Sequence, residues 1–175
     1  MKKLLLLSGG VGSRAGLSVP KQYHEIKGTT LVESLLREIS SFFDELYVVA
    51  DPKYNNLFDN FNVKKMIKGS ENSRLDSLKN GLRGMPIQDD DLIFIHEAAR
   101  PKIKIDDLKK HQELTAKKKP SVTTSKVYNT MFVLDEHGEI IDSIPKTNIV
   151  NGNNPQSYIG SDLIGILPLL DNYVN

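Results

Sequence analysis

The residues best suited to chemistry in this chain lie in its first glycine-rich stretch and just after it. The segment Ser8-Gly9-Gly10-Val11-Gly12-Ser13-Arg14 directly follows four leucines, and Lys21 comes seven residues after Arg14. Glycines let a backbone approach a ligand closely, and exposed N–H groups in such a loop bind anions. Two cations at this spacing can reach either side of a bound polyphosphate. The stretch predicts a nucleoside triphosphate site; the alternative is a glycine-rich turn with two solvated cations.

Two common phosphate-binding loops do not fit this stretch. A Walker loop requires Gly-x-x-x-x-Gly-Lys-Ser/Thr, and no lysine follows Gly16. A dinucleotide fingerprint, Gly-x-Gly-x-x-Gly, leads directly into a helix, whereas here Gly16 comes one residue late and Pro20 interrupts. A dehydrogenase is therefore the least favoured enzyme class.

The expected secondary structure around these residues alternates between strand and helix. Apolar runs predict strands at residues 3–7, 45–50, 63–67 and 92–96, and helical patterns predict helices from about Thr30 and at 54–61, 74–83 and 105–118. Leu31, Leu35, Leu36 and Ile39 are the expected buried stripe of the first helix, which a Thr30–Glu33 capping box would begin. This alternation predicts a parallel sheet covered by helices on both faces. Ligands bind such sheets beyond the carboxyl ends of the strands, so the loops 8–21, 69–77 and 97–101 are expected to form one site.

The character of the chain changes after residue 127. Residues 131–134 and 139–144, joined by a turn at 135–138, have the pattern of a β-hairpin. A lone hairpin is marginally stable unless it packs on something. We expect a single domain over residues 1–175, with a dimerisation arm at about 127–150; docking of the hairpin on its own sheet is the alternative.

Bulk composition excludes several classes of protein. The chain has 175 residues, a net charge of +1 and no cysteine. The balanced charge argues against nucleic acid as a partner, and the lack of cysteine excludes disulfides and thiolate metal sites. No apolar run approaches the roughly 20 residues of a membrane span. These features predict a cytoplasmic protein that binds neither nucleic acid nor membrane.

Four separated segments resemble, in order, the CTP-dependent cytidylyltransferases of sugar-alcohol phosphates. They are the first loop with Pro20-Lys21-Gln22-Tyr23, the helix Arg74-Leu75-Asp76-Ser77-Leu78-Lys79-Asn80-Gly81-Leu82, the run Ile95-His96-Glu97-Ala98-Ala99-Arg100-Pro101, and Asn154-Pro155-Gln156-Ser157-Tyr158. The resemblance implies a Rossmann-like, three-layer α/β/α nucleotidyltransferase fold with a mainly parallel sheet. It also implies a homodimer that uses Mg²⁺ and transfers CMP from CTP to a sugar-alcohol phosphate.

The resemblance further implies roles for individual residues. Arg14 and Lys21 would stabilise the transition state at the triphosphate, and Glu97 would bind both the metal and the acceptor. Arg100, Thr130 and Lys146 would bind the acceptor, the last two across the dimer. The nucleotide-binding set would comprise Ser8, Gly9, Gly10, Gly12, Ser13, Gly69, Ser70, Arg74, Ser77 and Ala98, of which Gly69, Ser70 and Ser77 would read the base edge. Two of these roles have an alternative: Glu97 could form a salt bridge with Arg100 instead of binding a metal, and Arg74 could be a solvated helix residue instead of a ligand contact.

The chemistry of this reaction suits the residues present. A phosphate monoester has a second pKa near ~6, so it is already an adequate nucleophile at neutral pH and needs no general base. The protein must align two polyanions and neutralise the charge that develops on the α-phosphate and the leaving group. Mg²⁺, an arginine and a lysine are suited to that task. His96, at the end of a strand, is expected to be a hydrogen-bonded structural residue.

Several positions depart from the family's pattern, most of them around the acceptor. Glu97 replaces an aspartate, Lys146 an arginine, and Asn154 a threonine. The sequence also ends before the segment in which the family supplies a lysine that faces the acceptor, and we expect the chain to be a fragment.

The sequence is compatible with more than one acceptor and with more than one class of protein. We favour 2-C-methyl-D-erythritol 4-phosphate, used in isoprenoid synthesis, with ribitol 5-phosphate as the alternative acceptor. A sugar-1-phosphate nucleotidyltransferase that uses UTP or GTP, and a relative that binds CTP without turnover, are the competing classes.

Overall fold

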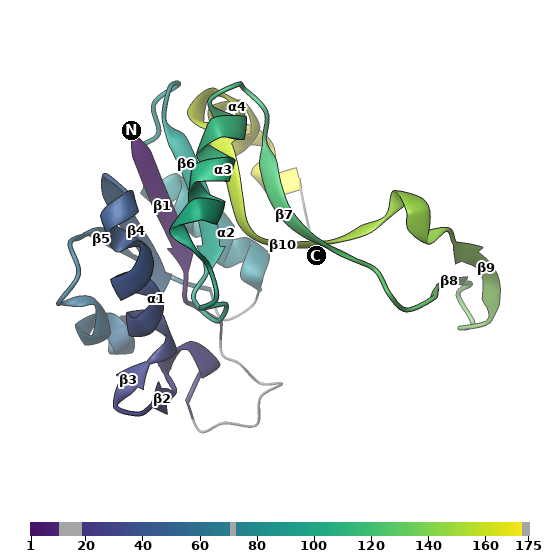
Figure 1. Ribbon diagram of the computed structural model, residues 1–175, viewed down its shortest axis with the longest axis horizontal. Helices are drawn as coiled ribbons and strands as arrows, with labels where there is room; N and C mark the ends of the chain where they lie inside the picture. The colour runs from purple at the N-terminus through teal and green to yellow at the C-terminus, as the bar shows by residue number, and fades with distance from the viewer. Residues whose placement is uncertain (11–18, 71–72, 173–175) are drawn as a thin grey trace.

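The computed structural model describes residues 1–10, 19–70 and 73–172. Its centre is a six-stranded sheet with the strand order β5-β4-β1-β6-β10-β7 (Figure 1). The strands are β1 (Lys2–Leu7), β4 (Glu45–Ala50), β5 (Val63–Lys68), β6 (Leu92–Glu97), β7 (Ser121–Lys126) and β10 (Val150–Ile159). Neighbouring strands among β5, β4, β1 and β6 pair in parallel, and β10 is antiparallel to both of its neighbours. The predicted mainly parallel sheet is confirmed.

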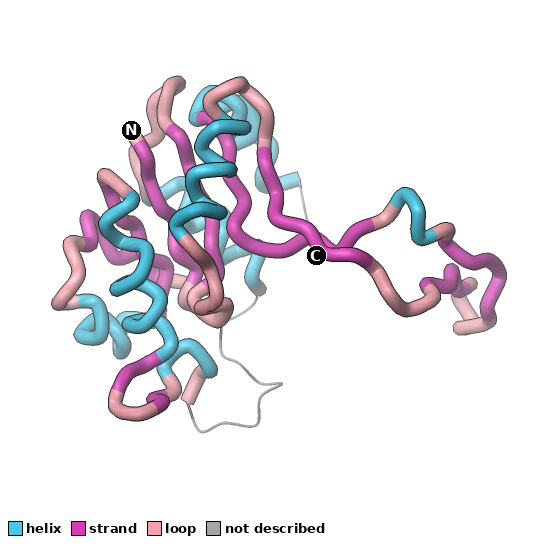
Figure 2. The backbone as a smooth tube through the Cα atoms, viewed as in Figure 1, coloured by secondary structure: helices cyan, strands magenta, loops and turns pink. Residues whose placement is uncertain are grey.

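Helices cover both faces of this sheet, so the molecule has three layers (Figure 2). On one face α1 (Leu31–Ile39) and α3 (Ile105–Thr115) share a hydrophobic core with Leu4 and Leu6 of β1. On the other face α2 (Arg74–Gly84) and α4 (Gly160–Ile166) share a second core with Leu5 and Leu7. Successive side chains of a strand point to opposite faces, so a run of consecutive leucines fills both cores.

The first helix begins as expected, but it buries a different stripe. The side chain of Thr30 accepts a hydrogen bond from the Glu33 backbone, and the Glu33 carboxylate accepts one from the Thr30 backbone, which confirms the capping box. Val32 is buried where Leu31 was expected, and Leu31 is partly exposed. Position 32 shares one helical face with 35, 36 and 39, because those spacings match the helical period of 3.6 residues.

Other boundaries also differ from the sequence-based expectation. The helix expected at 54–61 is a 3₁₀ helix, η4 (Pro52–Phe58), capped by the Asp51 side chain, and α3 ends at Thr115 rather than at 118. Strand β10 was not predicted at all. The remaining short elements are η2 (Lys21–Tyr23), β2 (Glu25–Ile26), β3 (Thr29–Thr30), η3 (Ser40–Phe42), η5 (Lys146–Asn148) and η6 (Leu167–Asn172).

The predicted hairpin is present and stands away from the body of the molecule. Strands β8 (Met131–Leu134) and β9 (Ile140–Ile144) pair with each other in a separate two-stranded sheet. Figure 1 shows them at the tip of an arm that projects beyond β7 and β10. The hairpin therefore does not dock on its own sheet.

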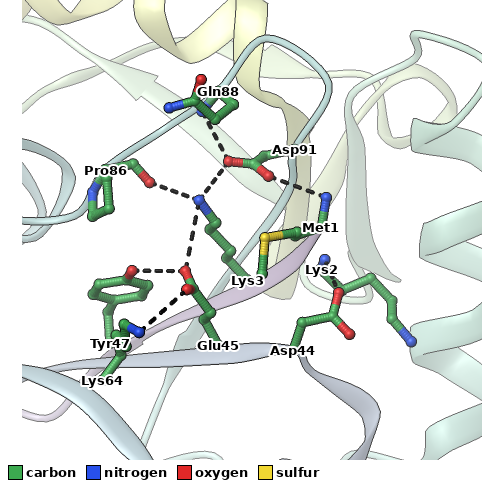
Figure 3. Close-up of polar contacts among 10 residues, drawn as sticks. All are labelled: Met1, Lys2, Lys3, Asp44, Glu45, Tyr47, Lys64, Pro86, Gln88 and Asp91. Atoms are coloured by element: carbon green, nitrogen blue, oxygen red, sulfur yellow. Dashed lines mark hydrogen bonds and ion pairs between the residues drawn. The ribbon is translucent and has the colours of Figure 1, made fainter.

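A buried group of charges joins strands at the amino edge of the sheet. The Lys3 Nζ lies 2.6 Å from Asp91 Oδ2 and 3.6 Å from Glu45 Oε2, and it donates to the Pro86 carbonyl (Figure 3). Asp91 also accepts from the Gln88 backbone N–H. Since Lys3 is on β1 and opposite Glu45 on β4, these contacts tie the two strands to the loop before β6.

No helix in the described part of the chain combines the length and the apolar character needed to cross a membrane.

Candidate functional site

The loops expected to form one site do meet at the carboxyl edge of the sheet. The Ser8 N–H donates to the Val49 carbonyl at 2.7 Å, and the Gly69 N–H donates to the Ala50 carbonyl at 3.0 Å. The loops after β1 and β5 are thus both anchored to the end of β4, which lies between them. The loop after β6 begins on the other side of β1.

Two of the predicted glycines face each other across this edge. A Cβ on Gly9 would lie 3.4 Å from the Gly69 Cα and 3.3 Å from the Ser77 Oγ, and a Cβ on Gly69 would lie 3.2 Å from the Gly9 Cα. Only glycine lets the two backbones approach this closely without displacement. The Ser77 Oγ accepts from the Ser70 N–H at 2.9 Å and donates to the Ser70 carbonyl at 3.3 Å. Ser77 therefore holds the turn that presents Gly69 and Ser70.

The segment that carries Lys21 is fastened to the first loop by its two following residues. The Gln22 Nε2 donates to the carbonyls of Ser8 and Gly10 at 2.9 and 2.8 Å. The Tyr23 hydroxyl donates to the Ser8 carbonyl at 2.7 Å and accepts from the Ser8 Oγ at 2.8 Å, and burial raises the pKa of Tyr23 to about 12. Both side chains are buried while Lys21 is exposed. Lys21 is therefore held at the rim of the site.

Gln22 and Tyr23 were given no role from the sequence, although they stand in the motif that contains Lys21. Gly12, Ser13 and Arg14 lie outside the described residues.

A pocket of about 250 Å³ opens between the ends of β1, β4 and β5. Its wall includes a residue pair that the sequence analysis missed: the rings of Tyr23 and Tyr54 stack with centroids 3.9 Å apart. The loop after β4 could have been included from the sequence, because every strand of the predicted parallel sheet ends at the same edge. The lining residues are Ser8, Gly9, Gly10, Pro20, Tyr23, Asp51, Pro52, Lys53, Tyr54, Lys68, Gly69 and Ser70.

A cluster of charged side chains lies where β6 ends. The Glu97 carboxylate accepts hydrogen bonds from the Nε atoms of Arg74 and Arg100, the latter at 2.9 Å. Arg100 also donates to the Asn153 Oδ1 at 3.2 Å. Burial raises the pKa of Glu97, but the bonds from Arg100 and Arg74 outweigh it and hold the pKa below its usual range. The salt bridge to Arg100 is formed, and Arg74 is paired with Glu97 rather than merely solvated.

His96 and Ala98 are buried residues that hold the loop carrying this cluster in place. His96 is 1% exposed, and its Nε2 donates to the Arg100 carbonyl at 2.9 Å, as expected of a structural residue. Ala98 is fully buried, and its N–H donates to the Leu7 carbonyl at 3.0 Å. Both residues hold the loop that carries Glu97 and Arg100, and neither lines the pocket.

Thr130 and Lys146 do not lie at the carboxyl edge of the sheet of their own chain. Both are exposed residues at the base of the hairpin, and the Lys146 Nζ donates to the Tyr128 carbonyl at 2.8 Å. Figure 1 shows this region on the projecting arm.

The carboxylates of the site decide whether it fits a magnesium ion. Among the described residues, no three His, Cys, Asp or Glu side chains group closely enough to hold a metal by themselves. Mg²⁺ in nucleotide sites is typically held by one or two carboxylates together with phosphate oxygens. The single carboxylate of Glu97 therefore fits an ion that arrives with a nucleotide.

Comparison with known proteins identifies relatives of the chain. The family model described as 2-C-methyl-D-erythritol 4-phosphate cytidylyltransferase matches residues 3–165. The enzyme of that name from Chlamydia pneumoniae is 36% identical over 151 residues, which cover 82% of this chain and 69% of the relative. The chloroplastic enzyme of Oryza sativa subsp. japonica is 29% identical over 161 residues, which cover 87% of this chain and 53% of the relative. The chain thus spans between about half and about two thirds of these relatives.

Solved structures share the fold. The 4-diphosphocytidyl-2C-methyl-D-erythritol synthase of Anaerococcus prevotii has a TM-score of 0.78 at 18% identity, over 99% of this chain and 76% of that one. The Francisella tularensis 2-C-methyl-D-erythritol 4-phosphate cytidylyltransferase has a TM-score of 0.72 at 22% identity, over 99% and 82%. The expected nucleotidyltransferase fold and the resemblance of the sequence to this family are both confirmed.

Proposed function

The chain belongs to the 2-C-methyl-D-erythritol 4-phosphate cytidylyltransferase family of CTP-dependent nucleotidyltransferases, and we propose that it transfers CMP from CTP to 2-C-methyl-D-erythritol 4-phosphate with release of pyrophosphate. This is a step of isoprenoid synthesis.

One observation carries the proposal. The carboxyl edge holds a glycine-lined pocket on one side of the β1 loop and the Glu97 cluster on the other. A nucleotide whose base enters the pocket extends its phosphates across the β1 loop toward Glu97 and Arg100. Lys21 is exposed at the rim, on the segment that Gln22 fastens to this loop, and in this arrangement it would lie next to the phosphates. The acceptor then has to approach from the β6 side.

The reaction in this arrangement is an in-line displacement at phosphorus. An oxygen of the acceptor's phosphate attacks the α-phosphorus, and the bond between the α-phosphorus and the pyrophosphate oxygen breaks. Lys21 stabilises the charge that develops on the phosphates, and the guanidinium of Arg100 anchors the acceptor's phosphate. Glu97 would hold a magnesium ion that arrives with the nucleotide, and the ion would supply further charge neutralisation. Glu97 in turn keeps Arg74 and Arg100 oriented.

The active form in this proposal is a homodimer. Thr130 and Lys146 lie on an arm that points away from their own site, and in the dimer each arm reaches the site of the other subunit. Lys146 then adds a cation next to the acceptor. Its ammonium is a point charge and gives no bidentate clamp.

The test is pyrophosphate release by the purified chain. With CTP, Mg²⁺ and 2-C-methyl-D-erythritol 4-phosphate, release is expected, and with UTP or with ribitol 5-phosphate it is expected to be at least tenfold slower. Lys21→Ala lowers kcat by about 100-fold, since one transition-state cation is lost. Lys119→Ala, at an exposed lysine of the α3–β7 connection, is the matched control and leaves kcat unchanged.

Three results would contradict the proposal in different ways. Release with ribitol 5-phosphate alone reassigns the acceptor. Equal release with UTP reassigns the nucleotide. Measurable CTP binding without release from any acceptor makes the chain a non-catalytic relative.

A further inference from the structure

We propose that Asp51 determines nucleotide specificity: its carboxylate accepts a hydrogen bond from the 4-amino group of cytosine and so selects CTP over UTP. The inference rests on the proposed function, because it requires that the base occupies the pocket between β1, β4 and β5.

The position of Asp51 follows from the sheet. It is the first residue after β4, which lies between β1 and β5, so it lines the pocket together with Gly9 and Gly69 from the two flanking loops. Its carboxylate is held in place: Oδ1 accepts from the Lys53 backbone N–H at 3.1 Å, and Oδ2 lies 3.0 Å from the Lys53 Nζ. A carboxylate offers about four lone-pair positions, so acceptor capacity is left for a ligand.

Asp51 is a pure acceptor at neutral pH. The hydrogen bond from the Lys53 backbone holds the pKa of the Asp51 carboxyl below its usual range, and the charges of Lys53 and Lys68 act in the same direction. The group is therefore ionised whenever the protein is near pH 7, and it cannot donate a hydrogen bond to a base.

That chemistry distinguishes the two pyrimidines. Cytosine presents an amino donor at its 4-position, whereas uracil, like thymine, presents a carbonyl acceptor there. A carboxylate facing the 4-position binds the first and repels the second. Hydrogen bonds to charged groups are the stronger class, so the discrimination from this contact is expected to be at least about tenfold.

Cations lie on both sides of the β1 loop. Lys53, which is paired with Asp51, and Lys68 line the pocket itself, whereas Arg74 and Arg100 contact Glu97 on the β6 side of the loop. The pocket of about 250 Å³ is also smaller than the roughly 300–1,000 Å³ that enclose a drug-sized ligand. It therefore suits one end of the nucleotide, and in the proposed function that end is the base.

The test is direct binding, which does not depend on turnover. Titration calorimetry of the whole chain with CTP, UTP and dCTP gives three dissociation constants for the wild type and for Asp51→Ser and Asp51→Asn. Serine and asparagine both keep a side-chain oxygen that caps η4, so the fold of the loop is preserved. Both variants are expected to reduce the preference for CTP over UTP at least tenfold, mainly by weakening CTP. Asp59→Asn, at the other end of η4 and outside the pocket, leaves the preference unchanged.

Each contrary result has a distinct meaning. If the Asp51 variants keep the wild-type preference for CTP, the carboxylate only caps η4 and the inference is wrong. If CTP and UTP weaken equally while dCTP does not, Asp51 binds the ribose, which also overturns it. A wild-type chain with no preference for CTP overturns the proposed function itself, and the inference with it.

Discussion

At the scale of the residue, the ion pairs at the two edges of the sheet differ in how far solvent reaches them. At the carboxyl edge, Glu97 pairs with Arg74 and Arg100, whose side chains are 50% and 51% exposed. Such pairs are screened by water and can be redistributed when an anionic ligand arrives. At the amino edge, the paired side chains of Lys3 and Asp91 are only 4% and 2% exposed. That pair belongs to the architecture of the sheet.

The buried pair gives a stability prediction. Asp91→Asn is expected to lower the free energy of unfolding by about 3 kcal/mol, because the buried Lys3 ammonium loses its nearest carboxylate and keeps only Glu45, at 3.6 Å. Urea denaturation at neutral pH measures the loss. The matched control is Asp171→Asn at the Arg83–Asp171 pair, where Asp171 is 74% exposed, and its expected cost is at most about 1 kcal/mol. Equal losses in the two variants would show that burial does not set the strength of these pairs.

At the scale of the element, one histidine joins α3 to the antiparallel strands. The His111 Nδ1 lies 3.1 Å from the Ser157 Oγ of β10, and its Nε2 lies 2.9 Å from the Thr123 Oγ1 of β7. The Thr115 Oγ1 lies 2.6 Å from the same Ser157 hydroxyl. Burial lowers the pKa of His111, as it does for His96 in β6. Both rings are therefore held in the neutral form.

This arrangement predicts a pH dependence of stability. A histidine whose pKa is lower in the folded state stabilises the fold above its unfolded pKa of about 6.5, and this contribution falls as the pH drops toward the folded pKa. Between pH 7.5 and pH 5.5 the free energy of unfolding is expected to fall, with a slope of at most about 1.4 kcal/mol per pH unit for each histidine. Urea denaturation at five pH values measures the slope.

A variant of His111 tests whether this side chain contributes to the dependence of the free energy of unfolding on pH. His111→Gln keeps hydrogen-bonding capacity toward Ser157 and Thr123 but cannot be protonated, so the slope is expected to decrease. His137→Gln, on the exposed turn of the hairpin, is the control and leaves the slope as in the wild type. A slope that is unchanged in His111→Gln would refute the role given to this ring.

At the scale of the whole molecule, the projecting arm favours a homodimer because its hairpin exposes large apolar side chains. Phe132, Leu134, Ile140 and Ile141 of the hairpin are 51%, 55%, 62% and 63% exposed. A two-stranded sheet alone is marginally stable, and a contiguous exposed apolar surface marks an interaction site. In the proposed homodimer, the partner subunit covers these side chains.

The prediction is a change in oligomeric state. The double variant Phe132→Ser/Ile141→Ser is expected to convert a dimer into a monomer, because it removes two large apolar side chains from the interface. Sedimentation equilibrium gives the mass, and circular dichroism shows that the three-layer body stays folded. Val122→Ser, at an apolar residue of β7 that is 41% exposed on the body, is the control and remains dimeric. A wild-type monomer, or a double variant that remains dimeric, would refute this role of the arm.

The pattern of residues along the chain was enough to predict the layers and the edge at which the site forms. Leu4 to Leu7 form a run that suits a strand covered on both faces, and Thr30 with Glu33 marks a helix start through purely local hydrogen bonds. The loops after β1, β5 and β6 had to meet, since parallel strands end at one edge. These features depend on neighbours in the chain or on the period of the pattern, which a sequence displays directly.

The contacts of the side chains at that edge depend on the folded arrangement of the strands and could not be predicted from the residues alone. Strand β10 is too polar to show a strand pattern; it exists because β6 and β7 pair with its backbone, and because His111 and Thr115 bind the hydroxyl of Ser157. Glu97 meets Arg74, 23 residues away, and Asp51 joins the pocket only because β4 lies between β1 and β5. Such partners are distant in sequence, and strand order, which places them side by side, is a property of the folded chain.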